Sequence, residues 1–105
     1  MPKKYRVKIT RHAEQDIQEI YSYIRNDNPK AASNFVGELE QQISSLEKFP
    51  SRCSVIPEAE ELGTAYRHLI YGQYRTIFRI SGNTIYILRV IHGARLLNLT
   101  VLTPL

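Results

Sequence analysis

The stretch AYRHLIYGQYRTIFRISGNTIYILRVIH, residues 65–92, decides the fold. It contains three runs rich in β-branched and aromatic residues, at 65–71, 74–80 and 84–92. The pairs Gly72-Gln73 and Gly82-Asn83 separate these runs. Two-residue connections that contain glycine are typical of tight β-hairpins. The stretch therefore predicts an antiparallel meander of three strands.

Two-residue turns would also fix which side chains share a face of the meander, because turn length sets the pairing register. One face would be mainly apolar and suited to packing against helices: Leu69, Tyr71, Phe78, Ile80, Ile85, Ile87 and Ile91. The other face would collect arginines, histidines and tyrosines among aliphatic residues: Tyr66, His68, Arg75, Ile77, Arg79, Tyr86, Leu88, Val90 and His92. Arg67 and Arg89 would lie on the helix side, near its edges.

The chain before the meander predicts a strand and then a helix. Tyr5, Val7 and Ile9 alternate with polar residues, which is the period of a half-buried strand. Apolar residues then recur at helical spacing from Ala13 to Ile24. Thr10 is placed to cap this helix at its N-terminus, and the turn-forming residues 26–28 should end it.

A second helix is predicted to begin at Asn28-Pro29, since asparagine caps helices and proline suits the first helical position. Its apolar stripe should end at Phe49-Pro50, because proline disfavours helical geometry in the residue before it. So short a turn between the helices makes them an antiparallel hairpin. Residues 51–64 have no periodicity and read as a connecting loop. The fold class is therefore α+β: a strand, a helix hairpin and a three-stranded meander forming one twisted sheet packed on the helices.

The bulk composition fits one soluble domain over residues 1–105. The chain has 105 residues, 43% hydrophobic and 23% charged. It has no apolar stretch of about 18 residues that could span a membrane, and no apolar segment of signal-peptide length near its N-terminus. A single cysteine, Cys53, cannot form an internal disulfide, which suits a reducing compartment. We expect a cytoplasmic protein.

The net charge of +4 is unevenly distributed along the chain. Residues 65–105 contain five arginines and no acidic residue, whereas residues 12–48 are acidic overall. Arginine binds phosphate and carboxylate groups through its planar guanidinium. The arginine-bearing sheet face could therefore bind RNA or an acidic protein segment. It could equally be an exposed face covered by amphipathic side chains, and composition does not separate these three alternatives.

Several fragments together resemble a ParE-like toxin of the RelE/ParE superfamily, known from plasmid stabilisation systems. They cover about residues 5–95 in order: NPKAASNF at 28–35, FPSR at 49–52, PE at 57–58, YRHLIYGQYRTIFRI at 66–80 and IYILRVIHGAR at 85–95. The resemblance implies a twisted antiparallel sheet packed on a helix hairpin. It also implies the toxin of a type II toxin–antitoxin system, neutralised by a cognate antitoxin in a hetero-oligomer.

The resemblance implies two possible targets. ParE-like members inhibit DNA gyrase, whereas RelE-like members cleave messenger RNA on the ribosome. By motif, Arg75 and Arg95 match the two arginines that RelE-like nucleases place on the scissile phosphate. Those nucleases carry a tyrosine about six residues after the second arginine, where this chain has Val101. His92 is then the remaining candidate for moving the proton.

We therefore expect gyrase inhibition by binding, with ribosome-dependent cleavage of messenger RNA as the alternative. The expected target- or phosphate-binding residues are Arg75, Arg79, Arg95, His68 and Tyr86. The candidates for catalysis, if the chain is a ribonuclease, are Arg75, Arg95 and His92. His12, His68 and His92 are not at metal-ligand spacing, so we expect no metal site and no cofactor.

Overall fold

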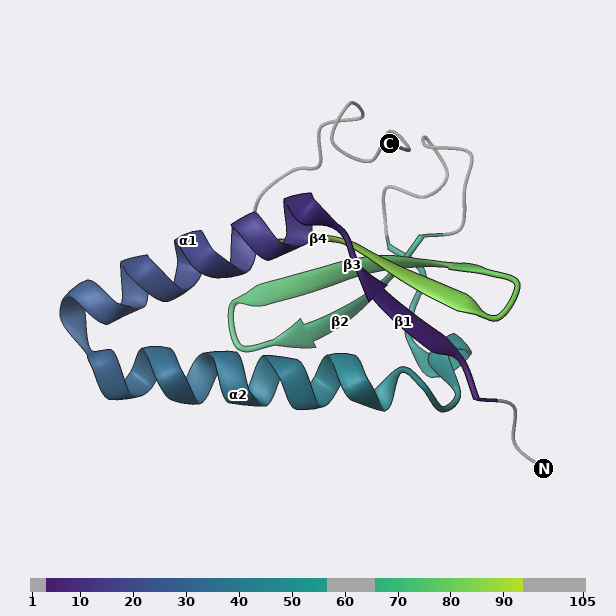
Figure 1. Ribbon diagram of the computed structural model, residues 1–105, viewed down its shortest axis with the longest axis horizontal. Helices are drawn as coiled ribbons and strands as arrows, with labels where there is room; N and C mark the ends of the chain where they lie inside the picture. The colour runs from purple at the N-terminus through teal and green to yellow at the C-terminus, as the bar shows by residue number, and fades with distance from the viewer. Residues whose placement is uncertain (1–3, 57–65, 94–105) are drawn as a thin grey trace.

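The computed structural model describes residues 4–56 and 66–93. These residues form an α+β fold whose element order is the predicted one (Figure 1). The elements are β1 (Arg6–Ile9), α1 (Arg11–Asp27), α2 (Pro29–Ser45), a short 3₁₀ helix η1 (Pro50–Arg52), β2 (Arg67–Tyr71), β3 (Tyr74–Ser81) and β4 (Thr84–His92). No helix in the described part of the chain is long and apolar enough to cross a membrane.

Both helices begin at the residues that the sequence predicts. The Thr10 hydroxyl accepts a hydrogen bond from the Ala13 amide at 3.3 Å, and so caps α1. The Asn28 side chain accepts one from the Ala31 amide at 3.1 Å, with Pro29 in the first turn of α2. The end of α2 differs from the prediction, because the helix stops at Ser45 and not at Phe49-Pro50.

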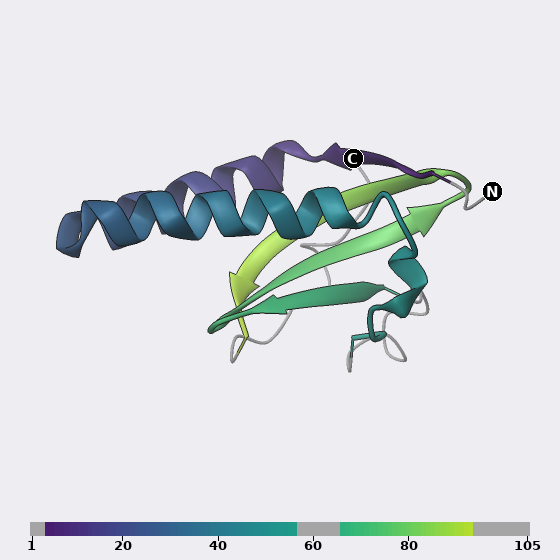
Figure 2. The same ribbon diagram turned by 90° about the horizontal axis from the view of Figure 1, so that it is seen from below.

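The four strands form one sheet in the order β1-β4-β3-β2. The meander β2-β3-β4 is antiparallel as predicted, and β1 joins it beside β4 in parallel orientation. Both helices cover the same face of the sheet (Figure 2). The main core lies between the layers, where Phe35, Leu39 and Ile43 of α2 meet Phe78, Ile85 and Ile87 of the sheet.

A β-bulge in β4 changes the predicted register. Phe78 pairs with Ile87, but the next residue on β3, Ile77, pairs with Arg89, so that Leu88 is an extra residue in β4. Every later side chain of β4 is consequently moved to the opposite face. Val90 therefore packs in the core under the helices, and Ile91 packs on the other face, the reverse of the prediction.

Thr10 holds the bulged segment against the start of α1. Its backbone amide donates to the Ile87 carbonyl at 3.0 Å, and its hydroxyl donates to the same carbonyl at 2.8 Å and to the Leu88 carbonyl at 3.2 Å. β1 ends at Ile9, so these bonds provide partners for the β4 carbonyls that lie beyond the last residue of β1. The bulge is thus tied to the helix cap by direct hydrogen bonds.

A smaller apolar cluster lies on the sheet face away from the helices. Ile56, from the segment after η1, and Tyr66 pack against Ile77 and Ile91, with Leu88 at its margin. The Ile56 amide donates to the Tyr66 carbonyl at 2.9 Å, and Val55 pairs with Arg67 in an isolated bridge. This face is therefore partly covered along β2, and the predicted arginine-bearing surface is narrower than the whole sheet.

Candidate functional site

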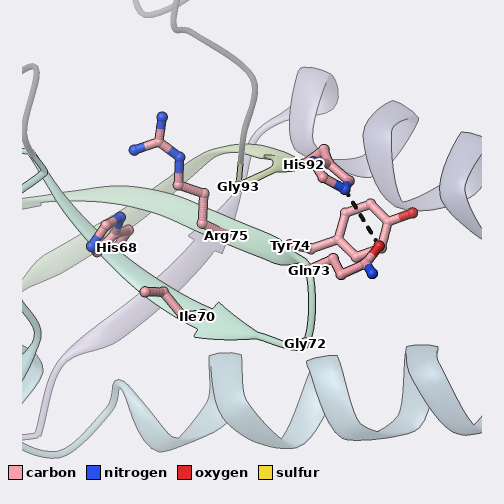
Figure 3. Close-up of a pocket in the computed structure, with 8 residues that line it drawn as sticks. All are labelled: His68, Ile70, Gly72, Gln73, Tyr74, Arg75, His92 and Gly93. Atoms are coloured by element: carbon pink, nitrogen blue, oxygen red, sulfur yellow. Dashed lines mark hydrogen bonds between the residues drawn. The ribbon is translucent and has the colours of Figure 1, made fainter.

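A shallow cavity lies where the β2–β3 turn meets the end of β4 (Figure 3). Its volume is about 440 Å³, and its lining residues are His68, Ile70, Gly72, Gln73, Tyr74, Arg75, His92 and Gly93. Gly72 adopts φ of 58°, which the tight turn requires and which other residues rarely adopt. The Gly93 amide donates to the Gln73 carbonyl at 2.7 Å and joins the end of β4 to this turn.

Arg75 and His68 share the sheet face that points away from the helices, as predicted. Arg75 pairs with Ile70 across β2 and β3, and His68 pairs with Ile77 next to them. Arg75 is 7% exposed and Ile70 is 66% exposed. A buried cation beside an exposed aliphatic side chain suits a partner that brings an anionic group and apolar surface together.

His92 lines the same cavity, but it belongs to the sheet face that the helices cover. It pairs with Tyr74, whose ring contacts Phe35 of α2 at a centroid distance of 5.2 Å. The rings of His92 and Tyr74 are 5.7 Å apart, and His92 Nε2 lies 3.4 Å from Gln73 Oε1. Figure 3 shows the side chains of His92 and Arg75 pointing away from each other. The bulge at Leu88 causes this separation, because without it His92 would share the face of Arg75.

Arg79 and Tyr86 lie together on the face of Arg75, toward the opposite end of β3. They are cross-strand partners, and the Arg79 guanidinium carbon lies 4.7 Å from the centroid of the Tyr86 ring. This is a cation–π contact, which fixes the orientation of both side chains. The predicted target- or phosphate-binding residues in the described part of the chain thus form two groups on one face, His68 with Arg75 and Arg79 with Tyr86.

Two other arginines of the meander hold the fold together. Arg67 donates hydrogen bonds to the carbonyls of Ser51 and Cys53, which anchors the segment before β2. Arg89 binds Asp16 of α1 through two hydrogen bonds, of 2.6 and 2.9 Å. The hydrogen bond to Asp16 raises the pKa of the Arg89 guanidinium above its ordinary value. The sequence analysis did not single out Asp16, whose partner is more than 70 residues away.

Three further points concern Arg95, Cys53 and metal-binding side chains. Arg95, named in both residue sets, lies outside the described residues. Burial raises the pKa of the Cys53 thiol despite the nearby charges of Arg52 and Arg67, so the thiol is poorly suited to act as a nucleophile. Within residues 4–56 and 66–93, no three His, Cys, Asp or Glu side chains are grouped so that they could hold a metal ion.

The comparisons with known proteins that give a match all find proteins of toxin–antitoxin systems. The sequence profile of the ParE toxin of the type II toxin–antitoxin system parDE matches residues 7–97. No curated protein sequence matches the chain. Among solved structures, the chromosomal ParDE toxin–antitoxin system from P. aeruginosa has a chain with 23% identity and a TM-score of 0.68. The match covers 85% of this chain and 96% of that one.

A second solved structure has a similar fold. It is the toxin–antitoxin complex RelBE2 from Mycobacterium tuberculosis, with 25% identity and a TM-score of 0.56. The match covers 85% of this chain and 98% of that one. The strand, helix hairpin and meander described above are therefore an arrangement that toxin–antitoxin proteins share.

Proposed function

Because the chain belongs to the family of ParE toxins of type II toxin–antitoxin systems, we propose that it stops bacterial growth by binding and inhibiting DNA gyrase. In this proposal a cognate antitoxin neutralises the chain by binding it. The solved relatives are toxin–antitoxin complexes, which supports an antitoxin as the natural partner.

The observation that carries the choice of gyrase is the distribution of the candidate residues over the two sheet faces. Arg75 and His68 lie on the face away from the helices, together with Arg79. His92 lies on the side of Tyr74 and Phe35. The arrangement therefore provides cations for binding, and the candidate proton-transfer group and the candidate phosphate ligand enter the cavity that they both line from opposite faces of the sheet. A toxin that acts by binding needs only the first of these features.

A messenger RNA endoribonuclease is the second candidate, favoured by the similarity to RelBE2. In that reaction the 2′-oxygen attacks the neighbouring phosphate while His92 takes the hydroxyl proton, and Arg75 and Arg95 stabilise the phosphate charge. The P–O5′ bond breaks, which leaves a 2′,3′-cyclic phosphate and a 5′-oxygen that takes a proton from water. His92 would have to leave Tyr74 and reach the face of Arg75 before it could act in this way. Messenger RNA cleavage therefore requires His92 to change its position, whereas gyrase inhibition does not require His92.

The decisive experiment is controlled expression of the full chain in bacteria, with plasmid supercoiling and messenger RNA integrity followed in parallel. We expect loss of negative supercoiling with intact messages. Arg79→Ala and Arg75→Ala should each weaken gyrase binding by about 30-fold, since arginines at the centre of an interface typically contribute about 2 kcal/mol. His92→Gln should retain growth inhibition.

Arg25→Ala is the matched control for this experiment, because it removes the same charge from an exposed position near the end of α1. Circular dichroism and soluble yield should be measured for Arg75→Ala, because Arg75 is buried, while Arg79→Ala tests the same face at a partly exposed position. Rapid message cleavage that His92→Gln abolishes would establish the ribonuclease. Growth inhibition that survives both arginine changes would exclude this face as the binding surface.

A further inference from the structure

The two layers of the molecule carry opposite charges. The helices α1 and α2 contain six acidic residues and three basic ones, and a seventh acidic residue, Glu47, lies just after α2. The four strands contain no acidic residue and six basic ones: Arg6, Lys8, Arg67, Arg75, Arg79 and Arg89. All the acidic residues in the described part of the chain therefore belong to the helical layer. A charge distribution of this kind turns the sheet toward any large anion that approaches.

Three of the strand cations lie beside one another on the face away from the helices. Lys8 of β1 pairs with Tyr86 of β4, and Tyr86 pairs with Arg79 of β3. Arg6 lies two residues before Lys8 on the same face of β1, opposite Thr84. Arg6 and Lys8 are exposed, and Arg79 and Tyr86 are half-buried. We call Arg6, Lys8, Arg79 and Tyr86 the basic stripe.

The basic stripe has the spacing of a surface that can contact several phosphates at once. Side chains two residues apart on a strand are separated by about 6.6 Å, and neighbouring strands by about 4.8 Å. Lys8 and Arg79 therefore lie about 10 Å apart, on either side of Tyr86. Duplex DNA carries one negative charge per about 1.7 Å of its axis, so several phosphates fall within a surface of this size.

We infer that the basic stripe binds the phosphate backbone of duplex DNA. The stripe has the charge that DNA-binding surfaces share, because protein–DNA interfaces are strongly positive and the strands contain no acidic residue. Single-stranded nucleic acid is bound largely by stacking its bases on aromatic rings. In the basic stripe the one aromatic ring, Tyr86, already has Arg79 over its face at 4.7 Å. The stripe thus favours phosphate contacts, which a duplex provides.

DNA binding goes beyond gyrase inhibition, although its biological meaning rests on the proposed function. Gyrase acts on duplex DNA, so a toxin bound to it would lie beside that DNA. In that position Arg6 and Lys8 would contact the DNA backbone. Neither residue was a sequence-based candidate, because the place of β1 beside β4 is needed to bring them next to Tyr86.

The test measures binding of the purified full chain to a fluorescein-labelled 20-base-pair duplex by anisotropy, from 25 to 200 mM salt. The association constant should fall with salt, with a slope that reports the number of phosphates contacted. Lys8→Gln should reduce that slope by about 0.9, and the double variant with Arg6→Gln by about 1.8. Lys30→Gln, at the start of α2, removes the same charge from the helical layer and should leave the slope unchanged.

Arg6 and Lys8 are exposed, so their substitution should not disturb folding, and circular dichroism of each variant checks this. No binding at 25 mM salt, or an equal loss in Lys30→Gln, would overturn the inference. Tighter binding to a single-stranded RNA 20-mer or to poly-glutamate would overturn it as well.

If DNA binding is absent while Arg79→Ala still abolishes gyrase inhibition, only this inference fails. If DNA binding depends on Lys8 while the chain does not inhibit gyrase, only the proposed function fails.

Discussion

At the scale of single residues, Asp16 joins helix α1 to strand β4 through its carboxylate. Its carboxylate accepts hydrogen bonds from Arg89 Nε at 2.6 Å, from Arg89 Nη2 at 2.9 Å and from the Val90 amide at 3.0 Å. The side chains of Asp16 and Arg89 are only 11% and 18% exposed. Asp16→Ala leaves a buried guanidinium without its partner, so we expect the free energy of unfolding, measured with urea, to fall by about 3 kcal/mol.

Glu40→Ala is the control, since it removes an exposed carboxylate from α2 and should change stability by less than about 0.5 kcal/mol. If Asp16→Ala lowered the free energy of unfolding by less than about 1 kcal/mol, the stabilising role of the Asp16–Arg89 pair would be contradicted. The sequence could not predict this pair. An acidic residue within an amphipathic helix normally faces solvent, and nothing local to Asp16 reveals an arginine on a distant strand.

At the scale of elements, the connection from α2 to η1 contains an exposed aromatic residue with unusual backbone geometry. Phe49 has φ of 53° and ψ of 54°, and the residue is 64% exposed. The Arg52 guanidinium donates to the carbonyls of Lys48 and Phe49, at 2.9 and 3.1 Å, and stabilises this conformation. Phe49→Gly should raise the free energy of unfolding by about 1 kcal/mol, because glycine adopts positive φ without strain.

Phe49→Ala is the matched comparison for this urea measurement, since alanine keeps the strain and removes the same ring. We expect no gain in stability from it, and equal stabilities of the two variants would show that backbone strain is not the cause. This element also explains an error of the sequence-based prediction. Pro50 marks a helix end, but the local pattern does not reveal that the chain leaves helical geometry four residues earlier.

The strands show where sequence patterns suffice and where they do not. The glycine-containing turns correctly placed His68, Arg75, Arg79 and Tyr86 on one face, because the extra residue lies in β4 after Tyr86 and leaves the alternation of β2 and β3 unchanged. His92 lies beyond the bulge and was placed on the wrong face. The bulge depends on Thr10 and on the position where β1 ends, which are tertiary features. The functional roles of the correctly placed residues remain predictions.

At the scale of the whole molecule, one core joins the helical layer to the sheet. Leu39 of α2 is 1% exposed, and it belongs to the same cluster as Ala13 of α1, Phe78 of β3 and Val90 of β4. The hairpin cannot bury its apolar stripe without the sheet, and isolated short helices are marginal in water. The residues on the outer sheet face are thus held in place by packing on the inner face, and damage to the helical side should disturb the proposed binding surface as well.

Measuring whether the helices and the sheet unfold together in urea tests whether the sheet depends on the helices and whether the chain is a single domain. Leu39→Ala should lower the free energy of unfolding by about 3 kcal/mol, the typical cost of a cavity at a fully buried leucine. Helical circular dichroism and the tyrosine fluorescence of a Tyr21→Phe/Tyr23→Phe background should shift to the same lower urea midpoint, since the tyrosines that remain in the strands, such as Tyr74 and Tyr86, report on the sheet. Gln41→Ala, exposed on the same helix, should leave both midpoints unchanged. Separate transitions for the two signals would show that the layers fold independently, and the outer face would then need no support from α2.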